Sequence, residues 1–155
     1  MYSQHPKALC ALIAVVMCTV SCRTYNPPIV YSPQEGYQRL IAVKLFAFGG
    51  IGIAGQTSQG ELAFRAVLKS NNAVEQFRAV LSEGTDAAKL YALCGIRVLD
   101  RSAFETEAAA LRRANPAVTT MSGCMIGHEK AGDVVQEIAT GVYDLYLPKS
   151  KCRSG

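Results

Sequence analysis

Apolar residues recur three and four positions apart along most of the chain beyond residue 36. This is the spacing that places side chains on one face of an α-helix. Residues that start or stop helices bound each stretch. The pattern predicts helices over residues 37–48, 62–69, 73–81, 86–99, 103–114 and 133–140. We therefore expect a mainly α fold, a small single-domain helical bundle of about five to six helices.

The segment 86–99 is apolar on nearly all sides, so this helix is expected in the middle of the domain. Thr85 can cap its first turn, and Gly84 can end the helix before it. Three other helix starts contain Ser or Asn three residues before Glu, which is the capping-box pattern. These pairs are Ser58 with Glu61, Asn72 with Glu75, and Ser102 with Glu105.

Three segments leave alternatives open. Over 37–48 the apolar residues share a helical face, but Lys44 interrupts that face, so a strand over 41–48 is the second interpretation. Residues 118–127 hold two short apolar stretches around Ser122-Gly123 and predict a short β-hairpin or an extended loop. Residues 143–147 extend the last helix or form a strand.

The N-terminus carries an uncharged run over residues 8–20, preceded by the basic residue Lys7. The run has the length of the apolar core of a signal peptide and is shorter than the roughly 20 residues of a membrane span. It ends in Thr19-Val20-Ser21-Cys22, which resembles the lipobox of bacterial lipoproteins, with Thr19 where that family usually has leucine. The resemblance implies lipidation of the Cys22 thiol and cleavage before it. Secretion without a lipid and an uncleaved anchor are the alternatives.

This interpretation divides the chain into four segments. Residues 1–21 are the expected signal peptide, and residues 22–36 are the lipidated cysteine and a tether that three prolines hold extended. The helical domain is expected over 37–147, followed by a flexible tail over 148–155. Enterobacterial lipoproteins retained in the inner membrane resemble one another in an Asp after the cysteine. This chain has Arg23 at that position, so we expect it to be anchored in the outer membrane with its domain facing the periplasm.

Composition and charge restrict the partners. The chain is 50% hydrophobic and 18% charged, as expected of a packed domain. Its net charge of +4 comes from scattered basic residues and not from a dense stripe, so no nucleic-acid partner is predicted. The segment 50–55 matches the pattern GxGxxG, but a dinucleotide-binding fold needs a second strand after the next helix. Here helix follows helix, so we interpret the segment as a loop and expect no cofactor.

The cysteines after Cys22 are Cys94, Cys124 and Cys152. An exported protein meets an oxidising compartment, so we predict a disulfide between Cys94 and Cys124. Two buried thiols are the alternative, and Cys152 stays free or pairs with Cys94 or Cys124. Cys124 and His128 are close enough in sequence to suggest a thiol–imidazole pair. His128 is the only histidine after Cys22, and too few ligands accompany it for a zinc site, so no catalytic or metal-binding residue is predicted.

Three functional hypotheses follow. The first is a cell-envelope lipoprotein, tethered to the membrane by its lipid, that binds an envelope protein or supports an assembly without enzymatic activity. The second is a carrier of a small ligand or lipid, with a pocket between helices and the glycine-rich segment 49–55 as its mobile lip. The third is an enzyme or inhibitor with chemistry near Cys124 and His128. The predicted tether and compact core favour the first hypothesis.

Overall fold

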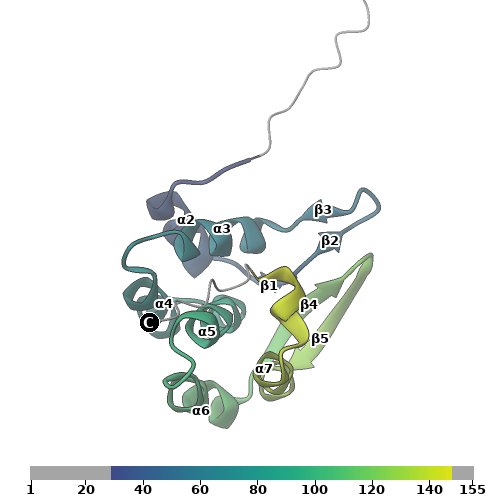
Figure 1. Cartoon of the computed structure of the whole chain (residues 1–155). Coiled ribbons are helices and arrows are strands. Elements are labelled where there is room, and N and C mark those ends of the chain that lie inside the picture. Colours follow the sequence, from purple (N-terminus) through teal and green to yellow (C-terminus); the bar gives the residue numbers. More distant parts are fainter. Residues whose placement is uncertain (1–28, 148–155) are drawn as a thin grey trace, which may run out of the picture.

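The structure is a computed structural model that describes residues 29–147. Within this range the chain forms six α-helices, five short β-strands and a final 3-10 helix (Figure 1). The mainly α fold is confirmed, and the strands form more sheet than the one predicted hairpin. In chain order the elements are α2 (Pro33–Ile41), β1 (Leu45–Phe46), β2 (Gly50–Ile51), β3 (Gln56–Thr57), α3 (Gln59–Leu68), α4 (Ala73–Glu83), α5 (Asp86–Leu99), α6 (Phe104–Ala114), β4 (Ala117–Ser122), β5 (Met125–Lys130), α7 (Ala131–Thr140) and η1 (Val142–Tyr146).

Helix α5 is the centre of the core. It is buried over most of its circumference, and α3, α4, α6 and α7 all pack against it. The side-chain oxygen of Thr85 accepts a hydrogen bond from the Ala88 amide at 3.1 Å. Such a cap satisfies a backbone donor that has no partner within the helix. The bounds predicted for this helix and its central position are both confirmed.

A three-stranded sheet in the order β1-β4-β5 lies beside the helices. β1 pairs in parallel with β4, and β5 pairs antiparallel with β4 and forms the edge. Val118 and Thr120 are buried on the face that meets the helices. The hairpin predicted over 118–127 is therefore confirmed, although it is longer than predicted. Its turn is Gly123-Cys124, where Gly123 has a φ of +56° that glycine adopts without strain.

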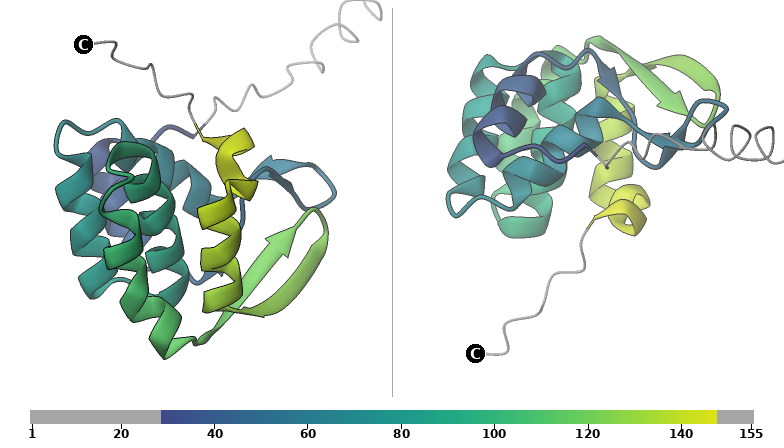
Figure 2. Two further views of the ribbon diagram at one scale, coloured as in Figure 1. Left: turned by 60° about the horizontal axis from the view of Figure 1, so that its bottom comes forward. Right: turned by 90° about the horizontal axis from the view of Figure 1, so that it is seen from above.

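β2 and β3 form a second, antiparallel hairpin from the glycine-rich segment. The Gly52 amide at its tip donates a hydrogen bond to the Gly123 carbonyl at 2.9 Å. The tips of the two hairpins, far apart in sequence, therefore lie side by side, and both project away from the helices (Figure 2). Residues 50–55 thus form a strand and a hairpin tip, not the strand-to-helix turn of a dinucleotide-binding fold.

The helix predicted over 37–48 is wrong at both ends. α2 begins at Pro33 because Ser32 and Glu35 form a capping box, in which the Ser32 amide donates to the Glu35 carboxylate at 2.9 Å. Proline suits the first helical position, where its missing amide has no partner to lose. Residues 33–36, predicted as the end of an extended tether, are therefore the first turn of a helix.

The end of the predicted helix belongs to the sheet. α2 stops at Ile41, and the chain enters β1 a few residues later. The alternative strand over 41–48 is thus correct for Leu45–Phe46 only. Ending the helix early also removes the conflict at Lys44, which is exposed in the loop before β1. At the C-terminal end, residues 143–147 neither extend α7 nor form a strand, because the chain turns into η1.

Of the three predicted capping boxes, only half of one forms. Ser58 Oγ accepts from the Glu61 amide at 3.0 Å, whereas the Glu61 carboxylate points into the protein. Asn72 and Ser102 make no capping hydrogen bond. Short polar side chains bond to whichever backbone or side-chain group lies nearest, so the sequence pattern alone does not ensure the cap. The helices nevertheless begin within a few residues of their predicted starts.

Candidate functional site

The residues predicted to carry function are dispersed. The predicted signal peptide, Cys22, Cys152 and the predicted tail over 148–155 lie outside the described residues. Cys94 is buried in α5, and Cys124 is exposed in the turn between β4 and β5. Both are free thiols, so the predicted Cys94–Cys124 disulfide is wrong. A disulfide needs the two Cα atoms to lie within about 7 Å of each other. The hairpin extends away from the helices, so Cys124 at its turn is not close to Cys94 in α5.

Cys124 and His128 do not form a catalytic arrangement. His128 lies exposed on β5, and its Nδ1 is 3.4 Å from Thr119 Oγ1 across the hairpin. Four residues of extended chain span roughly 13 Å, which separates the imidazole from the thiol at the turn. Within residues 29–147, no three His, Cys, Asp or Glu side chains gather as metal ligands would. In the same range no helix is long and apolar enough to cross a membrane.

The two described thiols differ in their environments, which gives a direct test. Burial raises the pKa of the Cys94 thiol, so this residue is both covered and protonated at neutral pH. We expect brief alkylation of the folded protein to modify Cys124 and leave Cys94 unmodified until the protein unfolds. Peptide mass mapping under non-reducing conditions measures both. A peptide linking Cys94 to Cys124, or equal modification rates, would contradict the structure.

A buried polar network fixes the chain between β1 and β2. The Tyr91 hydroxyl accepts from the Ala47 amide at 2.9 Å and donates to the Ala47 carbonyl at 2.7 Å. Ser58 Oγ donates to the same carbonyl at 2.8 Å. The Glu61 carboxylate, only 1% exposed, accepts from the Gly49 amide at 2.9 Å. Side chains of α3 and α5, together with Ser58 just before α3, thus form hydrogen bonds with backbone groups of a loop that has no strand partner. These hydrogen bonds set the direction of the β2–β3 hairpin.

This network makes stability sensitive to alkaline pH. Burial raises the pKa of Tyr91 to about 12, whereas a tyrosine in an unfolded chain ionises near pH 10. Between these values the unfolded chain loses a proton that the folded protein keeps, so the free energy of unfolding falls as pH rises. The stabilisation is complete below about pH 10. Burial also raises the pKa of Tyr143, which therefore contributes a loss of its own over the same range. We expect urea unfolding between about pH 10 and 12 to show a loss that is smaller in Tyr91→Phe than in the wild type by on the order of 2 kcal/mol.

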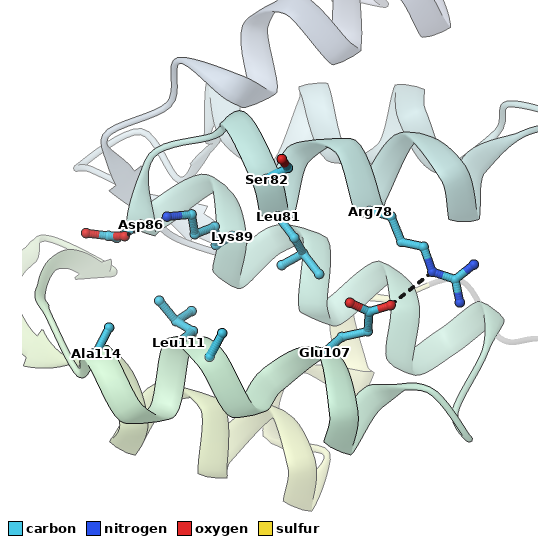
Figure 3. Close-up of a pocket in the computed structure, with 9 residues that line it drawn as sticks. Arg78, Leu81, Ser82, Asp86, Lys89, Glu107, Leu111 and Ala114 are labelled. Atoms are coloured by element: carbon cyan, nitrogen blue, oxygen red, sulfur yellow. Dashed lines mark hydrogen bonds and ion pairs between the residues drawn. The ribbon is translucent and has the colours of Figure 1, made fainter.

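A groove lies between α4 and α6, with α5 as its floor (Figure 3). Its volume is about 440 Å³. α4 and α6 both pack on α5, and Arg78 of α4 bridges to Glu107 of α6 at 3.0 Å near one end. Leu81 and Leu111 extend into the space between the two helices. Its lining residues are Arg78, Leu81, Ser82, Asp86, Lys89, Glu107, Ala110, Leu111 and Ala114.

The groove has the chemistry of a helix-binding surface. On α6 its lining residues fall at helical spacing, so one stripe of the helix faces the opening. Ala110 and Ala114 are exposed on this stripe, and Ser82 is exposed on the opposite wall. Small side chains at the rim allow another backbone to approach closely. The Arg78–Glu107 ion pair, and the Lys89–Asp86 pair of α5 at 3.2 Å, place charged groups beside Leu81 and Leu111.

This groove is not predictable from the amino-acid sequence. The stripe on α6 is visible as alanine and leucine at helical spacing, but that pattern does not show whether another helix covers it. Whether a helix face is covered depends on how α4 and α6 are placed on α5, and that is a property of tertiary packing. None of residues 49–55, the predicted lip of a carrier pocket, lines the groove.

Fold and surface together define a small, mainly α protein with a central helix, a three-stranded sheet at its side and an open interhelical groove. Comparisons with known proteins add no family to this description. No family model, no curated protein and no solved structure matches the chain.

Proposed function

We propose that this chain is a lipid-anchored protein of the bacterial cell envelope that binds a helical segment of a partner protein in the groove between α4 and α6. The observation that carries the binding role is the lining of that groove, in which two leucines and three small residues stand among four charged side chains. The anchoring role is supported by the apolar run over 8–20 and the lipobox-like Thr19-Val20-Ser21-Cys22.

Physical chemistry favours a helix as the bound element. An amphipathic helix binds a groove by placing residues at positions i, i+3, i+4 and i+7 against apolar side chains. Leu81 and Leu111 supply such a surface, and the alanines of α6 leave room for the incoming backbone. Polar groups at the rim then select the orientation of the partner more than they add affinity. A protein-binding role in the envelope needs no catalytic residue in this chain.

The anchor is tested by metabolic labelling with an alkyne analogue of palmitate. We expect the wild-type chain to take up the label and fractionate with membranes, because two or more acyl chains give stable anchoring. Cys22→Ala should lose both properties. Cys18→Ala, which changes a cysteine of the same N-terminal segment, is the matched control and should retain them. Label that persists in Cys22→Ala would reject lipidation at this residue.

The groove is tested separately by a photoreactive amino acid at position 114. We expect a crosslink to a partner of one defined mass, and we expect Ala110→Arg to abolish it by filling the groove. Because Ala110 is exposed, this substitution leaves the core unchanged. The same photoreactive group at Gln136, exposed on α7, is the control. Equal crosslinks from positions 114 and 136, or crosslinks that survive Ala110→Arg, would contradict the proposal.

A further inference from the structure

Exposed aliphatic side chains gather at the tips of the two hairpins. Ile53 is fully exposed at the end of the β2–β3 hairpin. Met125 and Ile126, beside the β4–β5 turn, are 79% and 67% exposed. The hydrogen bond from Gly52 to Gly123 holds the two tips together. The molecule therefore presents one apolar projection, built from two hairpins, at a distance from its own core (Figure 2).

Both hairpin tips are also free of charge. Residues 45–60 contain no Asp, Glu, Lys or Arg, and neither do residues 114–127. The exposed faces of the helices, in contrast, carry many ion pairs, including Arg78–Asp100 and Arg112–Glu105. A charged side chain is strongly unfavourable inside a bilayer, whereas exposed isoleucine and methionine gain free energy on leaving water. The tips thus have the composition of a surface that enters hydrocarbon.

The proposed anchor brings this projection within reach of a membrane, and the inference rests on that part of the proposed function. The ten peptide units from Cys22 to Ser32 span at most roughly 36 Å, whatever their arrangement. A domain of about 120 residues has a radius of gyration near 14 Å and is therefore roughly 35 Å across. A domain held by Cys22 cannot move away from the bilayer by much more than its own width. The membrane is then the apolar phase that the tips meet most often.

We propose that the two hairpin tips insert together into the bilayer to which the chain is anchored, with Ile53, Met125 and Ile126 entering its apolar region. This second contact fixes the orientation of the domain. α4 and α6 lie on the opposite side of the molecule from the tips in Figures 1 and 2. Insertion therefore directs the groove away from the lipid, where a partner can reach it.

Cys124 provides a native position for a probe, because it is exposed at the tip while Cys94 is buried. The full-length protein is isolated from cells as its Cys152→Ser variant, labelled at Cys124 with a polarity-sensitive fluorophore, and reconstituted into phosphatidylethanolamine–phosphatidylglycerol vesicles. A share of the lipids carries bromine on the acyl chains. Insertion to the depth of interfacial segments should shift the emission to the blue and quench about half of it. The control carries Cys124→Ser and Thr106→Cys, which places the probe at an exposed position of α6 outside the groove, and should show neither effect.

The double substitution Ile53→Asp and Met125→Asp tests the side chains themselves. Both positions are exposed, so the variant should keep its circular dichroism spectrum and thermal midpoint while quenching falls to the control level. The mass of the Cys22 peptide reports the anchor independently. Unquenched Cys124 in a lipidated protein overturns the insertion and leaves the anchor standing. A blue shift without bromolipid quenching shows that a protein or a second copy covers the tips, and it also overturns the insertion.

Discussion

Replacing Gly95 with valine is expected to lower the free energy of unfolding by about 3 kcal/mol, the upper end of the range for an overpacked core. Gly95 lies in α5, which packs against α4. A Cβ atom built there would be 2.3 Å from the ring of Phe77. That ring is fully buried and packs against Phe64, with ring centroids 5.5 Å apart. Neither the ring nor the two helix backbones can move aside without opening the core elsewhere.

Whether a larger residue at Gly95 stabilises or destabilises the protein shows which of two effects dominates, close packing or helix propensity. In an exposed helix, Gly→Ala stabilises by about 1 kcal/mol. At Gly95 even alanine should destabilise, by an amount smaller than for valine. Phe77→Leu should remove part of the conflict, so the double variant Gly95→Ala with Phe77→Leu should be more stable than the sum of the single effects predicts. Urea unfolding, with an unchanged m-value, measures the free energy of unfolding of Gly95→Ala, Phe77→Leu and the double variant. A Gly95→Ala protein that is more stable than wild type would disprove the close packing.

Local signals explain the part of the fold that sequence analysis predicted correctly. Gly84, Thr85 and the continuous apolar character of 86–99 all act within a few residues, and together they determine the start, length and burial of α5. The β4–β5 hairpin is similarly local, because a glycine turn joins two short apolar stretches. In such segments the residues that decide the structure are neighbours in the sequence.

The wrong predictions concern segments whose structure depends on more than a local pattern, often on residues distant in the sequence. Leu45–Phe46 is a strand because it pairs with β4, more than 70 residues later, and nothing near residue 45 specifies that pairing. Pro33 was interpreted as a helix breaker, although Ser32 and Glu35 were present to start a helix around it. The disulfide was predicted from compartment and count alone, without the direction in which the hairpin carries Cys124.

The candidate surfaces depend still more on tertiary structure. The groove exists because α4 and α6 both pack on α5 and leave space between them, and the apolar projection exists because a hydrogen bond joins two hairpins more than 60 residues apart. The uncharged composition of 45–60 and 114–127 was visible in the sequence. Without the structure, however, exposed tips could not be distinguished from buried strands, since both are apolar and uncharged.

Replacing Arg65 with methionine is expected to lower the free energy of unfolding by about 3 kcal/mol, even though Arg65 itself is half exposed. Arg65 is the partner of Glu61, whose carboxylate is almost completely buried. Methionine preserves the packing of the stem and removes the charge. The carboxylate then retains the Gly49 amide as its hydrogen-bond donor and has no countercharge. The value lies at the low end of the range for broken buried pairs, because water can approach through the site of the arginine.

Removing the carboxylate charge should reverse most of that loss. Glu61→Gln can still accept the Gly49 hydrogen bond and should cost only about 1 kcal/mol. The double variant Glu61→Gln with Arg65→Met should be close to Glu61→Gln alone, which gives a coupling energy of about 3 kcal/mol. Urea unfolding at pH 7 measures the cycle, and hydrogen exchange at the Gly49 amide shows whether the base of the β2–β3 hairpin loosens. If the losses of the two single variants simply add in the double variant, the buried Glu61 carboxylate does not need the charge of Arg65. The orientation of the hairpin tips would then have to rest on Tyr91 and Ser58, whose hydrogen bonds hold Ala47.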